Sequence, residues 1–412
     1  MRTILHCDMN NFYASVECYK NPAIRNLPVA VGGNQEARHG IILAKNYIAK
    51  KYNIQTGEPI VSAKRKCPDL VVVPPDFKTY MEYSNEAREI YYSYTDQVES
   101  FGLDENWLDV TGSARTFGTG EKIAGELRDK IKKQLGVTIS VGVSYNKIFA
   151  KLGSDIKKPD ATTVISKSNY REVAWPLPAS DLLYVGPKTD IKLKKYGIIT
   201  IGGIANTDVK ILKVLLGKNG EMLWGFANGF DCSPVKTMDH FQIPKSIGNS
   251  TTTYRDLVSD DDVKIGLMVM CESVASRMRE INLRCNTVQL HIRDKNLVTT
   301  ERQCKLSYPC CDAKSLFEAT FALYKNHFKN SPAIRSIGVR ATDFIPDKNI
   351  QLSFDTDAYK ISKQENLERQ IDIIRKKYGT SAIRQGTVLF DSKLAQLDPK
   401  NDNVIYPESY FH

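Results

Sequence analysis

The segment HCDMNNFYASVE, residues 6–17, constrains the fold of this 412-residue chain more than any other stretch. A short apolar run, residues 4–7, leads into the carboxylate of Asp8, and two aromatic residues, Phe12 and Tyr13, then open an expected helix. An acid at the end of a buried strand is costly unless a positive charge lies on it. A metal ion is the first candidate for that charge.

A second segment, ESFGLDENWLDV at residues 99–110, carries the adjacent acids Asp104 and Glu105 in an alternating pattern. If the two segments form neighbouring strands, these acids meet Asp8. Three carboxylates suit hard divalent cations, and two Mg²⁺ ions about 4 Å apart support in-line phosphoryl transfer. The residues therefore predict metal-dependent phosphoryl or nucleotidyl transfer, with structural ion pairs as the alternative.

The charge balance is basic, because 57 Lys and Arg residues exceed 47 Asp and Glu residues and give a formal net charge of +10. This excess fits a polyanionic partner, since each neutralised phosphate releases counterions, but a basic soluble protein has the same balance.

No apolar run approaches the roughly 20 residues that cross a bilayer, and the chain opens directly on a patterned strand without a signal peptide. Nine cysteines without a CxxC pair indicate reduced thiols. We therefore expect a cytoplasmic protein without a membrane partner.

The hydrophobic pattern up to residue 166 alternates between strands and helices, which predicts a two-layer α/β unit around the carboxylate strands. Tyr47 and Lys50, three residues apart, share one helix face, where they either hold phosphate oxygens or form a solvated surface. The expected elements are strands at 27–33 and 137–144, an apolar run from 40 that becomes helical over 44–52, and helices at 78–98, at 120–135 and after Asn146.

Residues 167–233 are lysine-rich and helical, with the turn YVGPKT at residues 184–189. Such a turn exposes backbone N–H groups at a helix N-terminus, which suits a phosphate, although a purely structural turn has the same pattern. Residues 231–246 contain two prolines and indicate a linker.

The part beyond the linker predicts an independent sheet of βαββαβ order with helices on one face. Four basic residues are expected on or near the uncovered face, either tracking a nucleic-acid backbone or simply solvated: Arg293, Arg302, Lys305 and Arg340. The polar tail from residue 346 is expected to carry a short helix around residues 367–374.

Taken together, these segments resemble the Y family of translesion DNA polymerases, closest to the bacterial polymerase IV and UmuC-type branch. The resemblance covers residues 1–345 and is carried, in order, by DMNNFYASVE, AKNYIAKKYNIQTG, FGLDENWLDVTGS, VGVSYNKIFAKLGSDIKKP, YVGPKT and PKSIG. It implies a low-fidelity DNA-directed DNA polymerase without proofreading, a monomer that extends primer-template DNA from dNTPs. The alternatives are a DNA-binding repair protein with an inactive palm and, less favoured, a palm-type nucleotide cyclase.

The resemblance also implies roles for single residues. Asp8, Asp104 and Glu105 would be the catalytic ligands of two Mg²⁺ ions, with the main-chain carbonyl of Met9 as a further ligand. Tyr13 would be the steric gate against ribose. The residues implied to bind the nucleotide are Phe12, Tyr13, Tyr47, Lys50 and Lys158, and those implied to bind DNA are Gly186, Lys188, Thr189 and Lys245 together with the four basic residues of the sheet face.

The implied fold is an α/β right-hand polymerase with an α/β palm, small fingers, a helical thumb with a helix-hairpin-helix motif and a βαββαβ little finger. Its expected limits are palm 1–10 and 78–166, fingers 11–77, thumb 167–233, linker 234–245, little finger 246–345 and tail 346–412. Within the tail, QLSFDTD at 351–357 resembles a sliding-clamp peptide through Gln351, Leu352 and Phe354, although the usual Leu before Phe354 is missing.

The chain departs from the family pattern at several positions. Asn10 stands where many members have a second Asp, Lys50 replaces the common Arg, and Gly102 occupies the position of a usual Ser. Lys50 exchanges a bidentate fork for a point charge, which should weaken triphosphate binding. These departures and the long tail favour the UmuC-type branch.

Overall fold

A central sheet carries the predicted acids in the computed structural model, which describes residues 2–33, 40–237, 243–328, 332–348, 357–395 and 397–398. The chain divides into two compact units, residues 1–33 with 41–241 and residues 242–406. The domain limits expected from the sequence are finer than this division and stay predictions.

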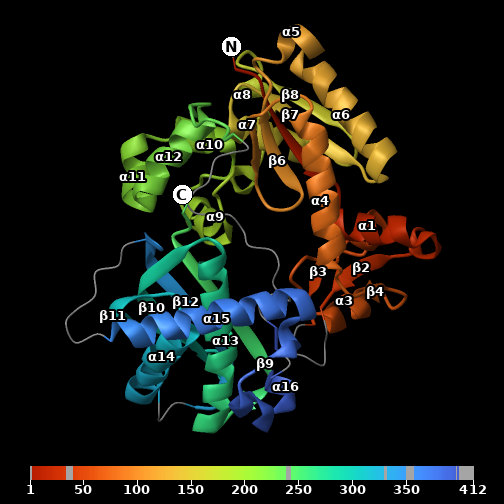
Figure 1. The fold of residues 1–412 in the computed structure, drawn as a ribbon. Helices are drawn as coiled ribbons and strands as arrows, with labels where there is room; N and C mark the ends of the chain where they lie inside the picture. Colours follow the sequence, from red (N-terminus) through yellow and green to blue (C-terminus); the bar gives the residue numbers. More distant parts are fainter. Residues whose placement is uncertain are drawn as a thin grey trace. The chain divides into compact units, whose positions relative to one another are not determined.

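The central sheet of the first unit has five strands in the order β5-β6-β1-β7-β8. Figure 1 labels β6, β7 and β8 of this sheet and the helices α4 and α6. Strand β1 is antiparallel to both of its neighbours and is buried over its whole length, as the apolar run at the N-terminus predicts. The strands are β1 (Ile4–Met9), β5 (Val98–Ser100), β6 (Glu105–Asp109), β7 (Ile139–Ser144) and β8 (Thr162–Ile165).

Helices cover both faces of this sheet. Helices α4 (Phe77–Tyr92) and α6 (Gly120–Leu135) share one hydrophobic core with alternate residues of β1, and α7 (Lys147–Ile156) packs on the opposite face. The expected limits of α6 are confirmed, whereas α4 ends at Tyr92 rather than at residue 98, which is the first residue of β5. Asn146 starts α7 as predicted, since its side chain accepts a hydrogen bond from the Phe149 N–H. A short helix α5 (Ala114–Phe117) precedes α6.

A three-stranded sheet in the order β3-β2-β4 forms a separate small core. The helix expected over residues 44–52 is wrong in its extent, because Ala44 belongs to β3 and only one turn follows. Asn46 explains the break: its backbone is extended, and its side chain accepts hydrogen bonds from the Ala49 and Val29 N–H groups. The elements are α1 (Phe12–Lys20), η1 (Pro22–Ile24), β2 (Val29–Gly32), β3 (Ile42–Lys45), α2 (Tyr47–Lys50), α3 (Ile60–Lys66) and β4 (Val71–Val73).

The lysine-rich part after β8 is helical, as predicted, and its apolar side chains form a core with α7. The Gly-Pro turn lies between a single 3₁₀ turn and α9, with Gly186 as the N-cap residue of α9. The elements are α8 (Tyr170–Val173), η2 (Ala179–Asp181), α9 (Pro187–Lys194), α10 (Ile201–Asn206), α11 (Val209–Leu216) and α12 (Lys218–Ala227).

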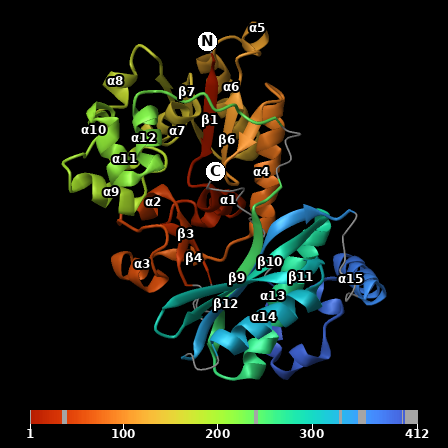
Figure 2. The ribbon, with the colours of Figure 1, turned by 90° about the vertical axis from the view of Figure 1, so that its left-hand side faces the viewer.

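The second unit confirms the βαββαβ order, with an antiparallel sheet in the order β11-β10-β12-β9 (Figure 2). Its two long helices pack on one face of this sheet, which leaves the other face uncovered by them. The elements are β9 (Ser246–Leu257), α13 (Asp260–Glu280), β10 (Leu283–Asp294), β11 (Thr299–Cys310), α14 (Ala313–His327) and β12 (Ile334–Pro346).

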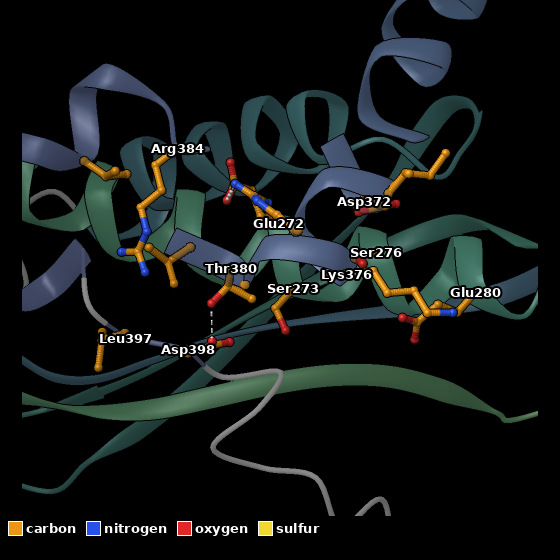
Figure 3. Close-up of a pocket in the computed structure, with 15 residues that line it drawn as sticks. Glu272, Ser273, Ser276, Glu280, Asp372, Lys376, Thr380, Arg384, Leu397 and Asp398 are labelled. Carbon is orange, nitrogen blue, oxygen red and sulfur yellow. Dashed lines mark hydrogen bonds and ion pairs between the residues drawn. The ribbon is translucent and has the colours of Figure 1, made fainter. Parts of the chain in front are cut away.

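The tail adds a layer on α13, so the expectation of a single short helix is wrong. Helix α15 (Ala358–Tyr378) is followed by η3 (Thr380–Ala382), η4 (Gly386–Phe390) and α16 (Ser392–Ala395). Arg279 of α13 pairs with Glu368 of α15 at 2.6 Å. A cavity of about 560 Å³ lies between α13 and the tail, where Thr380 donates a hydrogen bond to Asp398 (Figure 3).

Candidate active site

The register of the central sheet brings the three predicted acids together. Asp8 of β1 lies directly opposite Glu105 of β6, and the Met9 N–H donates a hydrogen bond of 3.0 Å to the carbonyl of Asp104. The expected neighbouring strands are thus confirmed. The three acids and Tyr13 line one cavity of about 320 Å³.

Burial leaves part of the negative charge in this cavity uncompensated. Burial raises the pKa of Asp8 to about 6, with Lys158 opposing the shift and Glu105 adding to it. The pKa of Asp104 rises to about 7 because of burial and the charges of Glu105 and Asp8. Burial would also raise the pKa of Glu105, but contacts with His6 and Lys151 outweigh it and lower this pKa to about 2. A hard cation would relieve the repulsion between these groups.

Two lysines hold the acids in this structure. Lys158 Nζ lies 2.7 Å from Asp8 Oδ2 and 2.8 Å from Asp155 Oδ1, and Lys151 pairs with Glu105. Among the described residues, no three His, Cys, Asp or Glu side chains are arranged closely enough to enclose a metal ion. The three acids still supply the carboxylate oxygens that hard divalent cations prefer, and ammonium groups lie beside two of them. Lys151 and Asp155 were not predicted from the sequence, although their spacing of four on α7 is the signal that places them on one face.

Tyr13 stands in a stack of aromatic rings beside the acids. Its ring centroid lies 4.4 Å from that of Tyr80 with 14° between the planes, and Phe77 meets it edge-on at 6.0 Å. The Tyr80 hydroxyl donates a hydrogen bond of 2.7 Å to Glu17 Oε1, and this contact fixes the Tyr80 ring. Phe12, 3% exposed, packs in the core of the central sheet while also contributing to the cavity wall.

The expected triphosphate residues lie on and near α2. The Lys50 ammonium is exposed and lies 5.7 Å from the centre of the half-buried Tyr47 ring. The pKa of Tyr47 is raised by burial, an effect that the charge of Lys158 opposes. Lys45 and Thr56 were not predicted from the sequence, yet both line the cavity and are joined by a hydrogen bond of 3.2 Å. The motif AKNYIAKKYNIQTG contains both residues and could have indicated them.

The Asn10 side chain forms hydrogen bonds through both its amide nitrogen and its carbonyl oxygen. Its amide donates a hydrogen bond of 2.9 Å to Ser140 Oγ, and its carbonyl oxygen accepts from the Asp160 N–H and the Thr138 hydroxyl at 2.9 and 3.0 Å. An amide supplies the donor that a carboxylate lacks. The replacement of the usual Asp at this position therefore has a structural reason.

The expected DNA-binding residues lie in two places. Gly186, Lys188 and Thr189 form the start of α9, and Lys245 is exposed just before β9. The remaining expected residues lie on the four-stranded sheet, where cross-strand partners share a face.

The register places three of the four basic sheet residues on the uncovered face and corrects the fourth. Leu290 is buried beneath the helices and pairs with Arg302, so the expectation that Arg302 lies on the uncovered face is wrong. Lys305 pairs with Thr287, three residues from Leu290, and therefore faces the other way, as do Arg293 and Arg340. The candidate clamp residues Gln351, Leu352 and Phe354 lie outside the described residues.

Comparisons with known proteins identify the family of this chain. The model of the impB/mucB/samB family matches residues 7–155, and that of the family's C-terminal domain matches residues 244–354. A solved Y-family DNA polymerase chimera is similar in fold, with a TM-score of 0.73 at 22% identity over 85% of this chain and 100% of its own. The chain belongs to the impB/mucB/samB family and is a DNA polymerase of the Y family, the translesion class.

Its relatives point to one branch of that family. The DNA polymerase IV of Acetivibrio thermocellus is 50% identical over 96% of this chain and 100% of its own length. The DNA polymerase IV 1 of Bacillus subtilis is 35% identical over 94% of this chain and 93% of its own. They favour the polymerase IV branch over the UmuC-type branch that the departures suggested. Family membership implies DNA and dNTP substrates and a divalent metal requirement. No helix in the described ranges has the length and apolarity needed to span a membrane.

Proposed function

We propose that Asp8, Asp104 and Glu105 hold the divalent cations with which this DNA polymerase joins a dNTP to a primer 3′-hydroxyl. The observation that supports this most is the pairing of Asp8 with Glu105 across adjacent strands, next to an Asp104 carboxyl whose pKa is raised to about 7. Two Mg²⁺ ions, when bound, would lower the pKa of the attacking hydroxyl and stabilise charge on the triphosphate and the leaving pyrophosphate. The Met9 carbonyl is a further candidate ligand.

The cationic side chains around the cavity would orient the triphosphate. Lys158 pairs with Asp8 and Asp155 in this structure, and a triphosphate would supply alternative oxygens for the same ammonium group. Tyr47 and Lys50 would bind phosphate oxygens from α2, with Lys45 as an addition from the structure. Lys50 offers one point charge and no bidentate fork, so its contact should be the weakest of the set.

Tyr13 would act as the steric gate. Because its ring is stacked on Tyr80, it has no room to retreat from a 2′-hydroxyl on the incoming sugar. A ribonucleotide would bring its 2′-hydroxyl against this ring and fit less well. A dNTP lacks that hydroxyl and would still fit. Phe12 would support the gate from the core.

DNA contacts would come from two surfaces. The backbone N–H groups of Gly186, Lys188 and Thr189 at the start of α9 suit a phosphate. On the four-stranded sheet, the uncovered face with Arg293, Lys305 and Arg340 would follow the DNA backbone, with exposed Lys245 before β9 beside the set.

Several further parts of the proposal rest on the family resemblance. The enzyme would work as a cytoplasmic monomer without proofreading, and residues 351–357 would bind a sliding clamp. Deleting this segment should reduce primer extension only when the clamp is present. Equal loss with and without the clamp would remove the assignment.

Primer extension with Mg²⁺ on undamaged and lesion-containing templates tests the proposal. We expect incorporation opposite the lesion, and a chain that binds DNA without extending it would instead be an accessory protein with an inactive palm. Release of pyrophosphate from ATP without DNA would point to a nucleotide cyclase. No feature of the described residues or of the relatives favours either alternative.

A further inference from the structure

His6 is a buried polar residue next to the acids that the proposed mechanism does not use. It lies in β1 two residues before Asp8, so both side chains project from the same face of the strand. Its cross-strand partners are Trp107 of β6 and Gly142 of β7. Its ring is fully buried, and a buried polar ring needs a partner for each of its nitrogens.

The surroundings fix the plane of this ring. The Trp107 ring lies 5.1 Å away, centre to centre, at 60°. Gly142 allows α7 to approach closely, because a Cβ there would stand 1.8 Å from the Ala150 carbonyl oxygen. This approach brings the fully buried Ser154 of α7 to the imidazole, and Ser154 Oγ lies 2.8 Å from His6 Nδ1.

The second ring nitrogen faces the catalytic acid. His6 Nε2 lies 3.2 Å from Glu105 Oε2. The Ser154 hydroxyl has two acceptors within reach, His6 Nδ1 and the Lys151 carbonyl at 2.7 Å. When it donates to Nδ1, the hydrogen of a neutral ring stands on Nε2 and faces the Glu105 carboxylate, although the two groups form no aligned hydrogen bond in this structure. Donation to the Lys151 carbonyl would instead leave a lone pair facing that carboxylate. Lys151 also pairs with Glu105, but its long flexible side chain fixes no plane for the carboxylate.

We propose that His6 is a positioning residue that orients the Glu105 carboxylate through Nε2–H, with Ser154 holding the ring from its other side. The inference rests on the proposed role of Glu105 as a cation ligand. Partners of this kind behind a ligating carboxylate set its direction and change metal affinity by about 10- to 100-fold. His6 is thus expected to act on cation affinity without touching the substrate.

Mn²⁺ titration of the full-length chain, followed by electron paramagnetic resonance without DNA or nucleotide, measures this effect directly. We expect His6→Leu to weaken Mn²⁺ binding about 10-fold, and His6→Gln to weaken it no more than about threefold because its amide N–H can reach the carboxylate. The Mg²⁺ concentration for half-maximal extension should rise in parallel, with the rate at saturating Mg²⁺ near that of the parent chain. Ser144→Ala is the matched control, since it removes a buried hydroxyl of β7 that donates to the Ile165 carbonyl.

A folded His6→Leu chain with unchanged Mn²⁺ affinity overturns the inference, and so does a His6→Gln chain that loses as much affinity as His6→Leu. If His6→Leu does not fold, Ser154→Ala decides: reduced Mn²⁺ affinity supports the inference, and unchanged affinity overturns it. Glu105→Gln separates the two proposals. If Glu105→Gln leaves Mn²⁺ binding and primer extension intact, the proposed function itself fails. If Glu105→Gln weakens both but the His6 variants leave Mn²⁺ affinity unchanged, only the positioning role fails.

Discussion

Neutralising Glu365 should loosen the docking of the tail helix α15 against β10 of the second unit. Arg284 of β10 is only 4% exposed and Glu365 of α15 is 8% exposed. The guanidinium meets both carboxylate oxygens of Glu365, one of them at 2.7 Å, and Asp347 at 2.6 Å. Removing one partner of a buried pair costs roughly 3–5 kcal/mol, and because Asp347 remains we expect about 3 kcal/mol for Glu365→Gln.

Hydrogen exchange of the α15 amides measures this cost, because α15 can undock without global unfolding. About 3 kcal/mol corresponds to roughly 100-fold faster exchange in α15, with no change in α6. The matched control is Glu318→Gln, whose partner Lys314 lies 3.9 Å away with both side chains 64% exposed. It should change stability by no more than about 0.5 kcal/mol. Equal α15 exchange in the two variants would refute the reasoning.

Three further predictions concern the active site. Tyr13→Ala should lower the preference for dATP over ATP about 100-fold in single-nucleotide incorporation, and unchanged selection would exclude the gate. Lys50→Arg should lower the KM for dNTP several-fold at constant kcat because a fork grips phosphate better, and an unchanged or higher KM would place Lys50 elsewhere. Asp104→Asn should raise the Tm of the chain in EDTA at pH 8. The pKa of Asp104 rises from 3.8 to about 7 on folding, so its ionised form destabilises the fold fully above pH 7 and not at all below 3.8. The gain should therefore vanish near pH 3.8, and a gain independent of pH would contradict it.

The central sheet could be predicted because its signals are local. The apolar run before Asp8, the four-residue spacing in α6 and the Asn146 cap each depend on a few neighbouring residues. Two acids in an alternating segment were enough to place Asp104 and Glu105 beside β1. The carboxylate cluster follows from that placement.

The rest depends on packing between distant segments. Glu365 pairs with an arginine 81 residues earlier, so the tail looks polar in sequence although it is docked in the structure. Ser154 and Lys151 reach the acids only because α7 lies close to the sheet at Gly142. The error at Arg302 had a visible cause, since residues 302 and 305 are an odd number apart and face opposite sides of a strand.

Primer extension by Asp104→Asn and Glu105→Gln, with DNA affinity measured on the same preparations, tests the central claim most directly. The account predicts that each variant loses roughly 1,000-fold in extension rate while binding primer-template DNA within about threefold of the parent chain. Variants that extend primers at the parental rate in Mg²⁺ would contradict the assignment of these carboxylates.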